Sequence, residues 1–312
     1  MVLFIDNIKQ EEERHPTSTK ALFNLFPSYK KNGTKFSEMP NILVDNKGSL
    51  YVMAREYAVV TPKNHRVIIL GSDEATTCII LIVRDCNTGA TGLAHLDNVG
   101  LIEQHIKEIM NSLQRLSEEC SQNKYSIYLV GGYSDPRGLS EEIFVGILET
   151  LQKVHQEMHL QLACIGDANT VLKDDKPWPK VYGAAVNIDT GEVFPSTFAE
   201  KGPDEILRGV KILVGSSNIM NIYENSSGMV KIGPFFYKMP RGIEHWLEET
   251  DEAILRKSST SPDVEPSCFV PNIKKAIQFM IENPRSIHVF KENKPHYFSR
   301  DETSGLWVPA NV

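Results

Sequence analysis

The sequence predicts an α+β fold, a sandwich of mainly antiparallel strands with flanking helices. Short apolar runs separated by Gly, Asn and Asp follow one another from residue 41 onward, as in sheets built from hairpins. Helical periodicity is confined to a few segments between these runs. A strand–helix–strand alternation occurs only locally, over residues 126–165, which argues against a doubly wound parallel sheet.

The individual elements follow from periodicity and turn chemistry. Apolar residues at helical spacing, such as Ile102, Ile106 and Leu113, predict the longest helix. The segment Asn187-Ile188-Asp189-Thr190-Gly191 is typical of a hairpin turn. The expected strands are 52–60, 66–70, 78–84, 91–95, 126–130, 160–165, 181–187 and 192–198, with 219–223 pairing with 229–232 and a terminal hairpin of 287–290 and 296–299. The expected helices are 19–26, 101–119, 139–156, 205–213, 244–257 and 270–282.

The domain organisation follows from a change in the residue pattern near residue 41, where short apolar runs begin. Residues 1–40 mix charge with Pro and Gly, and we expect them to form a loosely attached N-terminal segment. Residues 41–312 are expected to form a single domain. Within it, residues 244–312 are expected to be a helical and hairpin extension that packs on the core.

The composition excludes several classes of function. The chain of 312 residues is 41% hydrophobic and carries a net charge of −7, without a basic stripe, which argues against nucleic-acid binding. No run approaches the length of a membrane-spanning helix, and no signal peptide is recognised. The five cysteines are scattered without a CxxC pair, so neither a disulfide framework nor a zinc site is expected. We expect a reduced, intracellular monomer that needs no metal or cofactor.

Cys78 is the strongest candidate for a nucleophile because of its place in a predicted hairpin. The apolar run 78–84 is followed by turn-forming residues and then by Gly92-Leu93-Ala94-His95. Folding the chain about residues 86 and 87 pairs Cys78 with His95. Directly opposed residues on one face have Cβ atoms about 4.5–5.5 Å apart, which would bring the thiol within hydrogen-bond reach of the imidazole. A bulge at Gly89 would move this register by one residue.

The surroundings of Cys78 leave two interpretations open. A lone cysteine in an apolar strand is most often an inert core residue. The polar segment before it, however, would place uncommitted backbone N–H groups near the sulfur, where they could hold an oxyanion. A thiol beside an imidazolium has a depressed pKa and attacks as the thiolate. A further group must orient the imidazole, and the candidates are Ser72, Asp97 and Ser134.

Three motifs resemble the eukaryotic protein N-terminal asparagine amidohydrolase family. They are Gly71-Ser72-Asp73-Glu74-Ala75-Thr76-Thr77-Cys78, Gly92-Leu93-Ala94-His95 and Gly131-Gly132-Tyr133-Ser134-Asp135. The resemblance covers nearly the whole chain from about residue 48, including the segment 258–266, and is weakest over the first forty residues. The Cys-to-His interval is also similar to that of the CheD receptor deamidases, which belong with the cytotoxic necrotizing factor group of cysteine hydrolases.

The resemblance implies an α-β-β sandwich with a Cys-His-Ser triad. Cys78 and His95 take the first two roles. Ser72 is preferred as the third member of the triad because CheD-like enzymes have a hydroxyl residue six positions before their cysteine. Ser134 is the alternative candidate.

The activity implied by the resemblance is hydrolysis of the side-chain amide of an N-terminal asparagine. Attack by Cys78 would release ammonia and form a thioester, which water then hydrolyses to aspartate. Such an enzyme acts on proteins or peptides with a free N-terminal Asn, feeds the N-degron degradation pathway, and is cytoplasmic or both cytoplasmic and nuclear. A carboxylate must recognise the α-ammonium group. The substrate-binding candidates are Asp73, Glu74, Thr77, Tyr133, Ser134 and Asp135.

Two rival functions remain possible on the sequence. A non-catalytic module could recognise peptide N-termini with the same pocket. A CheD-like enzyme could deamidate internal Gln instead. The two histidines of His155-Gln156-Glu157-Met158-His159 lack the glutamate that a zinc protease carries directly after the first histidine, so no metal is expected there.

Overall fold

An eight-stranded sheet forms the centre of the molecule. The computed structural model describes residues 2–10, 15–116, 123–216 and 218–310. The strand order of the central sheet is β15-β5-β8-β7-β9-β10-β1-β2. Its strands in chain order are β1 (Val2–Ile5), β2 (Ile8–Lys9), β5 (Glu56–Val60), β7 (Ile79–Asp85), β8 (Thr91–Leu96), β9 (Lys124–Gly131), β10 (Glu157–Cys164) and β15 (Met220–Asn221).

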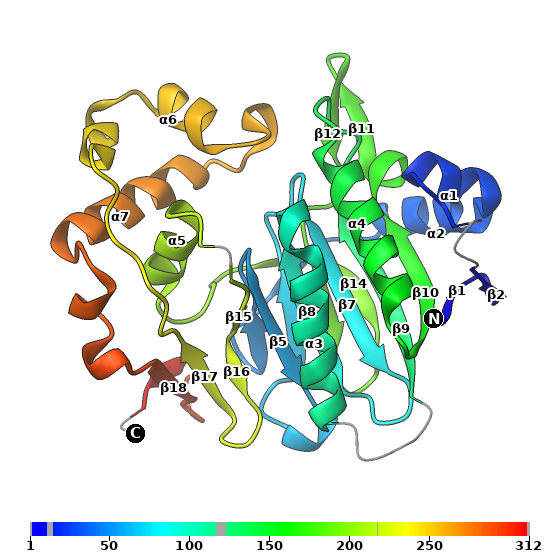
Figure 1. The fold of residues 1–312 in the computed structure, drawn as a ribbon, viewed down its shortest axis with the longest axis horizontal. Helices are drawn as coiled ribbons and strands as arrows, with labels where there is room; N and C mark the ends of the chain where they lie inside the picture. The colour runs from blue at the N-terminus through cyan, green and yellow to red at the C-terminus, as the bar shows by residue number, and fades with distance from the viewer. Residues whose placement is uncertain (1, 11–14, 117–122, 217, 311–312) are drawn as a thin grey trace.

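The central sheet lies between a helical layer and a second sheet. Helices α3 (Ile102–Leu116) and α4 (Leu139–Lys153) cover one face, and β14 lies behind the other (Figure 1). Leu81 of β7 belongs to the core beneath the helices, whereas its neighbours Ile80 and Ile82 belong to the core between the sheets. The second sheet has the order β3-β14-β13-β6-β4, with β3 (Ile42–Val44), β4 (Ser49–Tyr51), β6 (Ile69–Ser72), β13 (Ala184–Asn187) and β14 (Val193–Phe198). The predicted α-β-β sandwich is confirmed.

The parallel pairs of the central sheet lie mainly at the end that contains the N-terminus. β9 and β10 are parallel and are joined through α4, which is the single strand–helix–strand unit expected from the sequence. β1 pairs in parallel with the far side of β10. Helices α1 (Thr19–Leu25) and α2 (Pro27–Ser37) follow, and they bury Leu22, Tyr29 and Phe36. The division of the chain at residues 40 and 244 stays a prediction.

The C-terminal third of the chain adds three helices and a small sheet beside the β15 edge (Figure 1). Helix α5 (Glu205–Leu213) packs against α7 (Phe269–Glu282), and α6 (Asp251–Ser258) contacts α7 in turn. The small sheet has the order β16 (Tyr223–Glu224), β17 (Met229–Ile232), β18 (His296–Arg300) and β19 (Trp307–Pro309). A separate hairpin joins β11 (Thr170–Lys173) to β12 (Lys176–Pro179). The 3-10 turns are Pro62–Asn64, Val99–Leu101, Gly166–Asn169, Ile243–Glu248, Pro262–Val264, Ser286–His288 and Lys291–Asn293.

Several sequence-based boundaries were wrong at the C-terminal end. Residues 287–290 do not pair with 296–299, because β18 already has β17 on one edge and β19 on the other. Met220–Asn221 pairs with β5, so only Tyr223–Glu224 pairs with β17. The helix expected over 244–257 is interrupted where the Thr250 hydroxyl accepts from the Ala253 amide and begins α6 as a new helix. The predicted end of the helix 101–119 lies outside the described residues.

The register of the β7–β8 hairpin was wrong by two residues. His95 lies opposite Ile80, not opposite Cys78. The reason is the turn, which spans four residues because the Asp85 carboxylate accepts from the Asn87 and Thr88 amides and closes it from inside. Gly89, with a φ of +74°, completes it. A shift of two residues keeps every side chain on its original face, so Cys78 and His95 still belong to the same side of the sheet.

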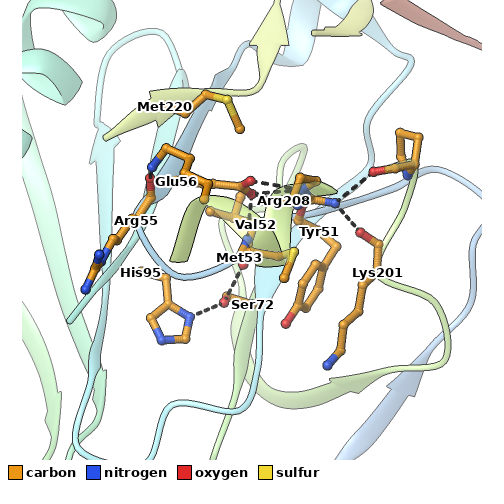
Figure 2. Close-up of polar contacts among 12 residues, drawn as sticks. Tyr51, Val52, Met53, Arg55, Glu56, Ser72, His95, Lys201, Arg208 and Met220 are labelled. Atoms are coloured by element: carbon orange, nitrogen blue, oxygen red, sulfur yellow. Dashed lines mark hydrogen bonds and ion pairs between the residues drawn. The ribbon is translucent and has the colours of Figure 1, made fainter. Parts of the chain in front are cut away.

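A buried ion pair fastens the chain between β4 and β5 to helix α5 (Figure 2). Arg208 and Glu56 are each only 1% exposed, and the guanidinium Nη2 donates to the Glu56 carboxylate at 2.6 Å. Nε also donates to Glu56, at 2.9 Å. Nη2 donates in addition to the carbonyl oxygen of Tyr51 at 2.9 Å, and Nη1 donates to the carbonyl oxygens of Lys201 and Pro203. One turn further along α5, Lys211 donates to the Arg55 carbonyl at 3.0 Å. We call this set of contacts the Arg208 clamp.

Replacing Arg208 by Met should lower the free energy of unfolding by about 3–5 kcal/mol, because Glu56 would stay buried without its counter-charge. Urea denaturation measures this change. Arg256→Met is the matched control, since the Arg256–Glu252 pair is 72% exposed on both sides and its loss should cost at most about 1 kcal/mol. Equal losses in the two variants would contradict the role given to the clamp.

Candidate active site

A cavity of about 460 Å³ opens beside the start of β7. Five parts of the chain line it: the segment 51–55, the segment 73–78, the end of β8 with Asp97, Lys201 in the loop before α5, and the C-terminal helices with their connecting loop. The polar and reactive side chains in this lining are Arg55, Asp73, Glu74, Thr76, Thr77, Cys78, His95, Asp97, Lys201, Lys257, Ser258, Ser259, Thr260, Glu265 and Asn272. The apolar part of the wall comes largely from Ile212, Leu213, Trp246, Phe269 and Ile273.

Cys78 and His95 line this cavity together, although they are not directly opposed. Cys78 stands one residue before β7, and His95 opposes Ile80. The two are therefore diagonal neighbours on one face, a relation that leaves Cβ atoms somewhat less than about 7–8 Å apart and within mutual reach of long or aromatic side chains. The sequence-based expectation of a thiol in hydrogen-bond reach of the imidazole rested on direct opposition, which is wrong, and the catalytic roles of the two residues stay a prediction.

The Ser72 hydroxyl fixes the tautomer of His95. Ser72 Oγ lies 2.8 Å from His95 Nδ1 and 2.6 Å from the carbonyl oxygen of Val52. A hydroxyl has one proton, and the carbonyl can only accept, so Ser72 donates to Val52 and accepts from an Nδ1–H group. The Nε2 atom of His95 is then an unprotonated acceptor. It is buried and has no hydrogen-bond partner among the described residues.

Burial holds both reactive groups in their neutral forms. Desolvation lowers the pKa of His95 to about 4, against the weaker opposing effect of Asp97. Desolvation also raises the pKa of Cys78 well above its usual range, and the charges of Asp97 and Glu265 add to the effect. At neutral pH Cys78 is therefore a thiol and His95 a neutral imidazole.

The four carboxylates that line the cavity are bound in different ways. Asp73 accepts from the Tyr51 hydroxyl at 2.7 Å and from the Phe198 amide at 2.9 Å, and burial raises its pKa. Glu74 pairs with Lys201 and also accepts from the Cys268 thiol. Asp97 pairs with Arg55 at 2.7 Å.

Glu265 is the fourth carboxylate. It accepts hydrogen bonds from the hydroxyls of Ser259 and Ser261, and burial raises its pKa. None of the ion pairs among the described residues involves it.

Two residues of the cavity lining have a strained backbone. Arg55 has a φ of +60° and Glu74 a φ of +59°, a left-handed conformation that is unfavourable for residues with side chains. The Arg208 clamp holds the first of these segments, since Lys211 binds the Arg55 carbonyl. The ion pair with Lys201 holds the second.

The structure brings together part of the predicted residue set. Ser72 contacts His95, whereas Asp97 contacts Arg55 and Ser134 contacts the Asp167 carboxylate at 2.8 Å. Asp73, Glu74 and Thr77 line the cavity, and the Thr77 hydroxyl lies 3.0 Å from that of Thr260. Tyr133, Ser134 and Asp135 are not among the described residues that line it. The Asp135 carboxylate accepts from the Leu139 and Ser140 amides instead and caps α4.

Sequence reasoning did not identify Glu265, Lys201 or Arg208 as parts of this region. Glu265 has a weak signal, since it stands in the hydroxyl-rich segment 258–266, which contributes to the family resemblance. Lys201 and Arg208 have none, because an ordinary basic residue in a loop or helix is usually a solvated surface group.

Comparison with known proteins identifies a family for the whole of this region. A family model described as protein N-terminal asparagine amidohydrolase matches residues 39–309. The human protein of that name is 36% identical over 265 residues, which cover 85% of this chain and 84% of the human one. The mouse protein of the same name is 33% identical over 308 residues, 98% of this chain and 97% of its own. The Arabidopsis thaliana protein of this name is 28% identical over 319 residues, 94% and 90% of the two chains.

The match extends over both the segments that carry Cys78 and His95 and the C-terminal elements that complete the cavity. The chain belongs to the protein N-terminal asparagine amidohydrolase family and is an amidohydrolase.

Proposed function

We propose that this chain hydrolyses the side-chain amide of N-terminal asparagine in proteins, giving N-terminal aspartate and ammonia through a thioester on Cys78. The observation that carries the proposal is the state of His95: its Nδ1–H group is engaged by Ser72, and its Nε2 lone pair is left without a partner in the cavity that Cys78 also lines. This is the arrangement of a general base beside a nucleophile. The names of the relatives supply the substrate class.

The first half of the reaction forms the thioester. His95 Nε2 takes the proton of the Cys78 thiol, and the sulfur attacks the carbon of the side-chain amide. The backbone N–H groups of Thr77 and Cys78 stand where the regular strand has not yet begun, and they hold the oxyanion of the tetrahedral intermediate. The His95 imidazolium then donates its proton to the amide nitrogen, the C–N bond breaks, and ammonia leaves.

The second half regenerates the enzyme. His95, again neutral, removes a proton from a water molecule, and the oxygen of this water attacks the thioester carbon. Collapse of this intermediate breaks the C–S bond, and the proton on His95 returns to the sulfur. The products are an aspartate side chain and the free Cys78 thiol, so protons and electrons balance without a cofactor.

Selectivity against N-terminal glutamine follows from the same geometry. Glutamine is longer by one methylene, which a pocket distinguishes by only about 1–3 kcal/mol through contact alone. The fixed positions of Cys78 and His95 add to this, because the longer side chain would misplace its carbonyl carbon relative to the sulfur. We further propose that the aspartate product feeds the N-degron pathway, with the protein in the cytoplasm, or in the cytoplasm and nucleus.

The first test is turnover of a peptide that begins with Asn. Incubation should release ammonia and change the peptide mass from that of the amide to that of the acid. Cys78→Ala should abolish both signals because the nucleophile is lost, and Cys86→Ala, which removes an exposed thiol in the β7–β8 turn, should leave them unchanged. Binding of the peptide by the wild-type protein without release of ammonia would favour a non-catalytic binding module.

A second test separates this reaction from deamidation of internal Gln. Acetylation of the α-amino group of the Asn peptide should abolish turnover, because recognition of the free amine is part of the proposal. Mass spectrometry of the acetylated and unacetylated peptides, with a peptide containing internal Gln alongside, gives the answer. Equal turnover of the acetylated peptide, or turnover of internal Gln, would favour the CheD-like alternative.

Ser72→Ala should lower kcat by roughly 10- to 150-fold, since His95 would lose the partner that fixes its tautomer, a hydrogen bond that is worth about 1.5–3 kcal/mol when the imidazole is charged. KM should change little. Ser134→Ala is the matched control and should retain wild-type kcat, because Ser134 contacts Asp167 outside the cavity. The opposite ranking of the two variants would assign the third role to Ser134.

The acid limb of kcat/KM should lie near pH 4–5. Burial lowers the pKa of His95 from 6.5 to about 4, so the base stays neutral and competent until the pH falls to that range. Initial rates of ammonia release between pH 4 and pH 8 measure this limb. A loss of activity centred at pH 6.5 would contradict the neutral, buried state of His95.

A further inference from the structure

Glu265 differs from the other three carboxylates of the cavity in its partners. The charges of Glu74 and Asp97 are compensated by Lys201 and Arg55. Asp73 has a hydrogen-bond donor on each of its two oxygens and is only 5% exposed. Glu265 has no cationic partner among the described residues, and both of its hydrogen bonds reach the same oxygen, Oε1. Its other oxygen, Oε2, accepts none from the described residues.

The hydroxyl network around Glu265 holds this carboxylate beside the nucleophile. The Ser261 hydroxyl lies 3.2 Å from Glu265 Oε1 and 2.9 Å from the Thr76 hydroxyl, and the Thr260 hydroxyl lies 3.0 Å from that of Thr77. The loop that carries Glu265 is thus bonded to the two residues that directly precede Cys78. Glu265 and Cys78 line the same cavity.

Glu265 is partly buried, and a carboxylate that is partly removed from water without a counter-charge is costly unless something compensates for it. A ligand that brings its own cation would compensate for the charge, and the cavity already holds an unpartnered buried polar atom, His95 Nε2, at its reactive end. In an N-terminal asparagine the α-ammonium group is separated from the side-chain amide carbon by only two carbon atoms. A group that binds the ammonium must therefore stand close to the nucleophile, as Glu265 does.

We propose that Glu265 binds the α-ammonium group of the substrate and so restricts the reaction to the chain terminus. This role rests on the proposed function and deepens it. An acetylated or internal residue offers no cation, and binding it would leave Glu265 desolvated and unpaired. The network of Ser259 and Ser261 directs Oε2 toward the substrate by occupying Oε1.

The test compares two peptides on each enzyme variant. One begins with Asn, and the other carries a succinamoyl group in its place, which has the same side-chain amide but a hydrogen atom where the amine stood. Wild-type enzyme should prefer the free amine by at least about 100-fold in kcat/KM. Glu265→Gln should lower kcat/KM for the Asn peptide by at least about 30-fold and bring the preference below about 10-fold. The preference is a ratio within one preparation, so loss of folded protein does not alter it.

Asp263→Asn is the matched control. It removes the same charge from the same loop, but Asp263 is exposed, pairs with Lys176 at 3.5 Å and does not line the cavity. The wild-type preference should survive this change. A Glu265→Gln enzyme that keeps the wild-type preference, or an equal loss in Asp263→Asn, would overturn the proposal.

Equilibrium binding to Cys78→Ala protein separates this proposal from the reaction itself. The variant should bind the Asn peptide more tightly than the succinamoyl peptide, and adding Glu265→Gln should remove the difference. If wild-type enzyme releases no ammonia but this difference is present and depends on Glu265, the proposed reaction fails and the ammonium site stands. If Cys78→Ala protein does not distinguish the two peptides, or still distinguishes them without Glu265, the ammonium site fails.

Discussion

The guanidinium of Arg208 is removed from water and occupied by Glu56 and by backbone carbonyls of two separate segments. Such a pair adds little net stability over a well-packed apolar pair, but it demands one geometry, because any other would leave a buried charge unpaired. This constraint also fixes the position of a segment that contacts the candidate active site. The segment held by Arg208 includes Val52, whose carbonyl accepts from Ser72, and Ser72 in turn holds His95 (Figure 2). The orientation of the base thus depends on a helix more than one hundred residues away in sequence.

Burial gives the site its chemical character. It keeps Cys78 as a thiol and His95 as a neutral imidazole. In the mechanism that we propose, the thiol proton moves to His95 Nε2, which is available because Nδ1 is occupied by Ser72. Removal from water also strengthens the interaction of a carboxylate with a cationic substrate group. One physical condition therefore serves both reactivity and recognition.

The cavity is shared between the sandwich and the C-terminal elements. The sandwich contributes Cys78 and His95, from the start of β7 and the end of β8. Helices α5 and α7 and the loop 258–265 contribute the facing wall, which contains apolar side chains together with Glu265. Hydroxyl contacts join the two halves next to Cys78. Residues from the segment 244–312 therefore form part of the cavity wall.

The sequence by itself determined the sandwich, the shared face of Cys78 and His95, and the place of Ser72 among a few candidates. Each of these follows from local rules: strand periodicity assigns faces, turn residues mark hairpins, and motif spacing identifies a family. The sequence did not determine the register of the β7–β8 hairpin. That register depends on a four-residue turn, which is stabilised by hydrogen bonds from backbone amides to the Asp85 side chain. Only the tertiary structure decided which hydroxyl reaches His95 and which carboxylates are left without a counter-charge, because these depend on partners such as Lys201 and Arg208 that are distant in sequence and carry no local signal.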